Sequence, residues 1–211
     1  MIGIEAAMSP ARLMRFTPAD TGCKHHALRM YVWNARLCEE FYIPLQTAEI
    51  CVRNAISETL TRRFTRGWYA SPTMNGFLTE KYRKELAEIV RREQQRKGAE
   101  FTVDHVVSGL SFGFWVHLIT SRYDSHLWMQ GVQRTFPHAP ATLDREKAHE
   151  KIDQLRRFRN MVAHHYAIFD RGPLREYQNL EAVLGWVSPD SVWLIRQLSS
   201  PARVINTRPN A

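Results

Sequence analysis

Apolar residues recur at steps of three and four along most of this 211-residue chain. This spacing places them on one face of an α-helix. The first such stripe consists of Leu28, Tyr31, Val32, Ala35, Cys38 and Tyr42. No stretch alternates apolar and polar residues between hairpin turns, and no internal repeat is evident. The sequence therefore predicts an all-α protein.

Proline and glycine residues set the expected limits of the helices. Pro44 is expected to end the first helix and to open the second, which closes on the basic residues Arg62, Arg63 and Arg66. The further helices are predicted over about 79–97, 102–123 (one helix or two), 143–166, 174–187 and 189–199.

One helical domain over 23–199 is expected, because 44% of the residues are apolar, enough to fill a core. Residues 1–22 contain Pro10, Pro18 and Gly22 and no sustained period, so a loosely ordered leader is predicted there. Residues 200–211 are expected to form a tail.

The formal net charge of +8 favours a polyanionic partner such as RNA. Many basic proteins nevertheless bind no nucleic acid, so charge alone leaves this interpretation open. Three cysteines without a CxxC pair suit a reducing compartment, and we expect a cytoplasmic location. The most apolar stretch, 112–120, is too short to span a bilayer, so no membrane contact is expected.

The segment 156–166 carries the residues best suited to chemistry. On a helix, Arg156, Asn160 and His164 lie one turn apart on a polar face, and Arg159 flanks them. A histidine can move the proton of a ribose hydroxyl, and a guanidinium can stabilise charge on a phosphate. No carboxylate cluster or zinc spacing accompanies them, which favours chemistry without a metal or other cofactor. The alternative is an ordinary solvated helix face.

Three elements in order resemble the Abi-like proteins, abortive-infection factors of the HEPN superfamily. Residues 159–165 (RNMVAHH) are similar to the family's Arg-x4-His motif. The stretch from Tyr31 to Ile56, with Glu49, Arg53 and Asn54 as Glu-x-x-x-Arg-Asn, resembles its amino-terminal helical pair. Residues 110–115 (LSFGFW) resemble its central element. The match covers about residues 25–170.

The resemblance implies a HEPN-like helical bundle with additional helices, forming a two-fold dimer that joins two motifs in one cleft. It also implies a metal-independent endoribonuclease that leaves 2′,3′-cyclic phosphate and 5′-hydroxyl ends, in a toxin or phage-defence role. Arg159 would polarise the phosphate, His164 would act as acid or base, and Asn160 would support them. A non-catalytic RNA-binding or regulatory module, and a purely structural dimer, are the alternatives.

Other residues have two interpretations each. Glu49, Arg53 and Asn54 either buttress the cleft or form helix-to-helix contacts, and Glu49 and Arg53 can pair with each other. His165 is expected to be supporting or structural. Tyr166 has the spacing of a tyrosine that partner enzymes modify in some HEPN toxins, which would make an antitoxin a partner, but a core position is favoured. Arg156 and the third-helix residues Lys84, Arg91 and Arg92 form either an RNA track or a solvated face.

Overall fold

The protein is described by a computed structural model that covers residues 2–17 and 23–210. Those residues form helices and connecting segments with no strand, so the all-α prediction is confirmed. Residues 1, 18–22 and 211 lie outside the described part, including Pro18 and Gly22 of the expected leader. No described helix is long and apolar enough to cross a bilayer.

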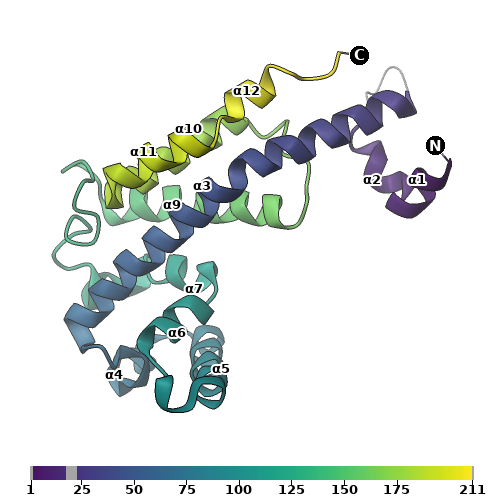
Figure 1. Cartoon of the computed structure of the whole chain (residues 1–211). Coiled ribbons are helices and arrows are strands. Elements are labelled where there is room, and N and C mark those ends of the chain that lie inside the picture. The colour runs from purple at the N-terminus through teal and green to yellow at the C-terminus, as the bar shows by residue number, and fades with distance from the viewer. Residues whose placement is uncertain (1, 18–22, 211) are drawn as a thin grey trace.

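The axis of the fold is α3, a single helix of 41 residues from Lys24 to Phe64. Figure 1 shows it running the length of the molecule, with the other elements arranged along it. The prediction that Pro44 divides this stretch into two helices was wrong, because Pro44 lies buried inside α3. A proline has no N–H, so the carbonyl of Glu40 one turn earlier loses its helical partner.

The carboxyl-terminal part of the chain supplies the missing partner at Pro44. The hydroxyl of Ser199 donates to the Glu40 carbonyl at 2.6 Å. The backbone N–H of Ser200 also donates to Glu40 Oε2 at 2.6 Å. Because a side chain 159 positions away satisfies the carbonyl, α3 continues through the proline.

This arrangement predicts a coupling between Ser199 and Pro44. Ser199→Ala should lower the free energy of unfolding by about 1–3 kcal/mol, because a partly buried carbonyl loses its donor. In a Pro44→Ala background the same change should cost little, because the N–H of residue 44 then bonds Glu40. The coupling is measured in a double-mutant cycle, by urea unfolding of the native protein, the two single variants and the double variant. Equal costs in the two backgrounds would show that Ser199 does not replace the lost helical bond.

Two groups of helices pack on α3 (Figure 1). Near its carboxyl end lie η1 (Trp68–Ala70), α4 (Pro72–Phe77), α5 (Glu80–Lys97), η2 (Gly98–Glu100), α6 (Val103–Gly109), α7 (Phe112–His117), η3 (Ser121–Tyr123) and α8 (Asp124–Leu127). Beside the remaining length of α3 lie α9 (Arg145–Ala163), α10 (Pro173–Val187), α11 (Pro189–Leu198) and α12 (Pro201–Ile205).

The helices predicted over 79–97, 174–187 and 189–199 are confirmed to within one residue, and 102–123 contains two α-helices and η3.

The segment expected to be a loose leader contains two short helices, α1 (Ile2–Met8) and α2 (Pro10–Met14). Phe16, after α2, is buried against the rings of Tyr31 and Phe169, with centroid distances of 5.4 and 5.8 Å. The expected tail contains α12, and the indole N–H of Trp33 donates to the carbonyl of Val204 at 2.7 Å. Short helices are marginal by themselves, and contacts of α2 and α12 with α3 stabilise these terminal segments.

Aromatic packing joins α3 to the helices beside it. Phe41 of α3 is fully buried and meets Phe158 of α9 edge-on, with ring centroids 4.9 Å apart. Its ring also meets Tyr177 of α10 at 5.9 Å. This three-helix contact holds α9 in place along α3, and α9 carries the candidate site.

Candidate functional site

The helix α9 ends at Ala163, three residues before the predicted end. His165 adopts a left-handed backbone, with φ of 59°. The N–H of Tyr166 reaches back to the Met161 carbonyl at 2.9 Å, and the N–H of His165 to the Val162 carbonyl at 3.1 Å. These are the two hydrogen bonds of a Schellman motif, in which glycine normally occupies the left-handed position. A histidine there gave no sequence signal for a helix end.

Because His165 adopts a positive φ, we expect a glycine at this position to stabilise the protein. His165→Gly should raise the free energy of unfolding by about 0.5–1 kcal/mol, because glycine adopts positive φ without a Cβ clash. The gain is limited because glycine also has more freedom in the unfolded chain. Thermal or urea unfolding measures it, with Ala163→Gly as the control. That change, within α9, should destabilise by a similar amount, and a shift of the same sign in both variants would contradict the assignment.

An ion pair joins Arg159 of α9 to Glu49 of α3. The Nε of Arg159 lies 2.8 Å from Glu49 Oε2, and its Nη2 donates to Oε1 at 3.4 Å. The Nη1 of Arg159 donates to the amide oxygen of Asn160 at 3.3 Å. Glu49 is 16% exposed and Arg159 39% exposed, so the guanidinium is held from the inner side and open on the outer side.

A cleft of about 950 Å³ runs between α3 and the end of α9. Four of the predicted site residues line it: Glu49, Arg53, Arg159 and His165. The predicted pairing of Glu49 with Arg53 is not observed, because Glu49 turns to Arg159 instead. The Nε of Arg53 is buried and has no hydrogen-bond partner within the structure described. The cleft therefore presents the partly exposed guanidinium of Arg159, held by Glu49.

His164 lies at the end of α9 and is exposed. Its backbone N–H caps the helix by donating to the Asn160 carbonyl at 2.9 Å, and its ring lies 6.5 Å from that of Tyr166. It is not among the residues that line the cleft. Within one chain, the fold thus brings together Arg159, Asn160 and Glu49 but leaves the His164 side chain outside this group.

Tyr166 is 61% exposed, so the prediction of a core position was wrong. The prediction extended the apolar period of α9 to residue 166, but the helix has already ended and the chain has turned. Asn54, on α3, is likewise exposed. The structure therefore leaves the Tyr166 ring accessible at the end of the motif.

Asn34 holds the segment that follows the motif, and sequence analysis did not single it out. It is 4% exposed on α3. Its amide oxygen accepts from the backbone N–H of Ile168 at 2.8 Å, and its Nδ2 donates to the Tyr166 carbonyl at 3.3 Å. One feature of the sequence could have indicated this role. Asn34 is a polar amide among the buried residues of α3, which include Trp33 and Leu37.

Near the amino terminus, α2 contacts the same segment. Arg12 donates through Nη2 to the carbonyl of His165 at 2.9 Å, and Arg15 pairs with Asp170. The turn after α9 is therefore held from α3 on one side and from α2 on the other.

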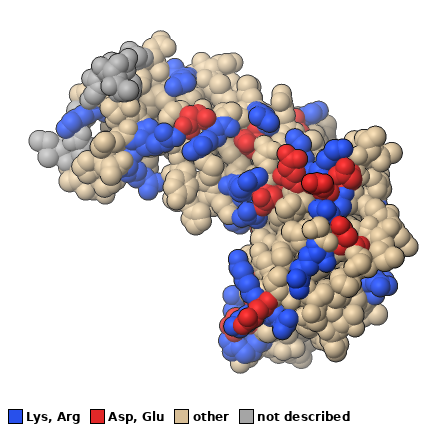
Figure 2. Space-filling view, turned by 180° about the vertical axis from the view of Figure 1, so that it is seen from behind, with Lys and Arg blue, Asp and Glu red and all other residues tan. Residues whose placement is uncertain are grey.

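The basic residues predicted as an RNA track are paired with carboxylates. Lys84 lies 2.6 Å from Glu80, Arg91 2.7 Å from Glu88, and Arg92 3.1 Å from Glu93. A hydrogen bond from Arg96, with help from Arg92, lowers the pKa of Glu93, so this carboxylate stays charged between its two arginines. On α9, Arg156 lies 2.7 Å from Asp153. Figure 2 shows acidic side chains among the basic ones on the back of the molecule.

No group of three or more His, Cys, Asp or Glu side chains with metal-binding geometry occurs in 2–17 or 23–210. Comparison with protein-family models, curated proteins and solved structures finds no match. The resemblance to the Abi-like family therefore stays a prediction that depends on the three motifs.

Proposed function

We propose that this protein is a metal-independent endoribonuclease of the HEPN type, in which Arg159 binds the scissile phosphate and His164 transfers a proton. The observation that carries the proposal is the Arg159–Glu49 pair at the cleft, five residues before an exposed histidine. This places a fixed phosphate donor and a titratable group at the same end of α9.

Arg159 retains capacity for a phosphate in this arrangement. A guanidinium has five N–H donors. In Arg159, Nη2 and Nη1 each donate one hydrogen bond, to Glu49 and Asn160, and Nε lies 2.8 Å from Glu49 Oε2. One N–H on each terminal nitrogen is left for phosphate oxygens, which suits bidentate binding. Glu49 orients the guanidinium of Arg159, and we assign Glu49 a positioning role.

We propose that a second copy completes the site. His164 of one chain does not line that chain's cleft, whereas a two-fold partner can bring its own His164 towards it. Of the apolar side chains that line the cleft, Val32 and Tyr42 of α3 are 44% and 67% exposed. Exposed apolar side chains of this kind favour a protein contact. Such a dimer would place the two motifs in one groove.

The test is cleavage of mixed RNA by the purified protein in EDTA, followed by analysis of the fragment ends. The native protein should leave 2′,3′-cyclic phosphates, and His164→Ala should cut at least ~100-fold more slowly. His138→Ala, at another exposed histidine, is the matched control and should cut normally. Arg159→Lys keeps the positive charge but loses the paired N–H donors of the guanidinium, so this variant should also cleave RNA slowly. Equal rates in the native and His164→Ala proteins would exclude the proposed role of His164.

The second candidate function is a non-catalytic RNA-binding or regulatory module. It is favoured by the direct pairing of Arg159 with Glu49, which offsets the charge of the guanidinium without a substrate. RNA retained without cleavage by the native protein would support it.

For the first candidate, a toxin or abortive-infection role predicts growth arrest on expression in bacteria. The same His164→Ala change should relieve that arrest, and an antitoxin is an expected partner.

A further inference from the structure

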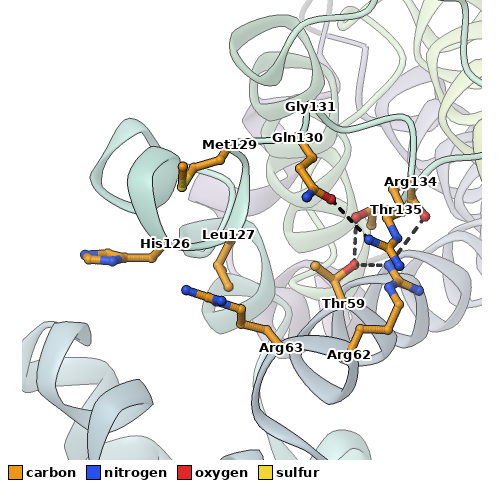
Figure 3. Close-up of a pocket in the computed structure, with 10 residues that line it drawn as sticks. All are labelled: Thr59, Arg62, Arg63, His126, Leu127, Met129, Gln130, Gly131, Arg134 and Thr135. Carbon is orange, nitrogen blue, oxygen red and sulfur yellow. Dashed lines mark hydrogen bonds between the residues drawn. The ribbon is translucent and has the colours of Figure 1, made fainter.

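A second cavity, of about 520 Å³, lies at the far end of α3 from the motif turn (Figure 3). The last turns of α3 form one wall, and the segment through α8 to Thr135 forms the other. Its lining consists of Thr59, Arg62, Arg63, His126, Leu127, Met129, Gln130, Gly131, Arg134 and Thr135. The volume falls within the range of about 300–1,000 Å³ that is usual for small-molecule sites.

Three arginines and no carboxylate line this cavity. In the view of Figure 3, Arg62 and Arg134 lie together on one side and Arg63 lies between them and His126. Neither Arg63 nor Arg134 forms an ion pair with a carboxylate of the described residues. Arg62 has only Glu58, at 3.8 Å and outside the lining. The cavity thus differs from α5, where carboxylates neutralise the arginines, and it concentrates charge that suits an anion.

Hydrogen bonds hold the polar side of the cavity in place. The hydroxyls of Thr59 and Thr135 lie 2.7 Å apart. Arg62 Nη2 donates to the Thr59 hydroxyl at 2.8 Å and to the Arg134 carbonyl at 3.4 Å. Because these bonds join α3 to the opposite wall, the Arg62 guanidinium is positioned before a ligand binds, which reduces the entropy lost on binding.

The other side of the cavity is apolar and aromatic. Met129 is 78% exposed there, and Leu127 lies beside it. The ring of His126 stacks on Phe77, with centroids 4.4 Å apart and planes within 8°. A methionine side chain and a supported flat ring offer a surface for a nucleobase, whose faces bind aromatic and sulfur-containing side chains. The arginines and these two side chains therefore line the same cavity.

We propose that this cavity binds a nucleoside phosphate, with Arg62, Arg63 and Arg134 on the phosphates and His126 and Met129 against the base. The ligand can be a free nucleotide or the 5′-phosphorylated end of an RNA, which share this chemistry. The proposal does not depend on the ribonuclease activity, since no residue of the cavity belongs to the motif.

The test is calorimetric titration of the full chain with ATP, pyrophosphate and adenosine, and with a short RNA with or without a 5′-phosphate. All RNA titrations use the His164→Ala background, so that cleavage does not interfere. Arg63→Gln/Arg134→Gln is the diagnostic variant, because these side chains do not support Thr59. Lys147→Gln/Arg175→Gln removes the same charge from exposed positions elsewhere and is the control.

We expect ATP to bind more tightly than pyrophosphate, adenosine to bind poorly, and the diagnostic variant to weaken ATP at least ~10-fold. The control should stay within about twofold of the native affinity. Stronger binding of the 5′-phosphorylated RNA than of ATP would identify an RNA end as the source. Equal affinity for ATP and pyrophosphate would overturn the base contact. Failure of ATP and of both RNAs to bind, or binding unchanged by the diagnostic variant, would overturn the whole proposal.

Discussion

Phe41→Ala is expected to lower the free energy of unfolding by about 3–5 kcal/mol. Phe41 is fully buried at the contact of α3, α9 and α10, and its ring meets Phe158 and Tyr177 edge-on. The substitution removes the buried area of a phenyl ring and leaves a cavity that three helices would have to close. Urea unfolding followed by circular dichroism measures the change.

The matched control is Trp193→Ala on α11, a larger aromatic side chain that is 64% exposed. Its loss should change the free energy of unfolding by about 0.5 kcal/mol or less. A cost for Phe41→Ala close to that of the control would mean that α9 and α10 do not pack on α3 as described. The candidate site would then lose its support, because Arg159 meets Glu49 only across this contact.

Asn34→Ala is expected to cost about 1–3 kcal/mol of unfolding free energy. The backbone N–H of Ile168 is buried and loses its acceptor, whereas the Tyr166 carbonyl can turn to water because Tyr166 is exposed. Freed from α3, the turn after α9 should open more often, so hydrogen exchange at the Ile168 amide should accelerate. Chemical unfolding and site-resolved exchange measure the two effects.

Asn54→Ala is the control for this prediction, because Asn54 is an exposed asparagine on the same helix. It should change stability by less than about 0.5 kcal/mol. If Asn34→Ala left the Ile168 amide as protected as in the native protein, the proposed anchoring of the turn would be wrong. If RNA is cleaved as proposed, Asn34→Ala should also slow cleavage by loosening the segment that follows His164.

The helices themselves could be predicted because their information is local. The apolar period and the stop at Gly98, whose φ is 53°, define α5 within a stretch of about 20 residues. The Ser-Pro start of α11 is similarly explicit, and the Ser188 hydroxyl accepts from the Ser191 N–H at 3.2 Å. In these elements the nearest neighbours in sequence determine the backbone.

The prediction at Pro44 was wrong because the deciding contact is not local, and the prediction at Tyr166 was wrong because His165 gave no sequence signal for the end of α9. Proline inside a helix leaves a free carbonyl, and here Ser199 satisfies it from the far end of the chain. The end of α9 depends on a left-handed histidine, and Asn34 and Arg12 hold the turn that follows it. A local pattern contains neither fact.

For the candidate site, the sequence by itself determined that Arg159, Asn160 and His164 lie near the end of one helix, because helical spacing is a local property. Only the tertiary structure decided that Glu49 pairs with Arg159 rather than with Arg53, and that His164 is not among the residues that line the cleft. No sequence pattern predicted the arginine-lined cavity between α3 and the segment after α8. An ion pair or a cavity between distant segments depends on how helices pack, and packing is set by the shapes of many side chains together.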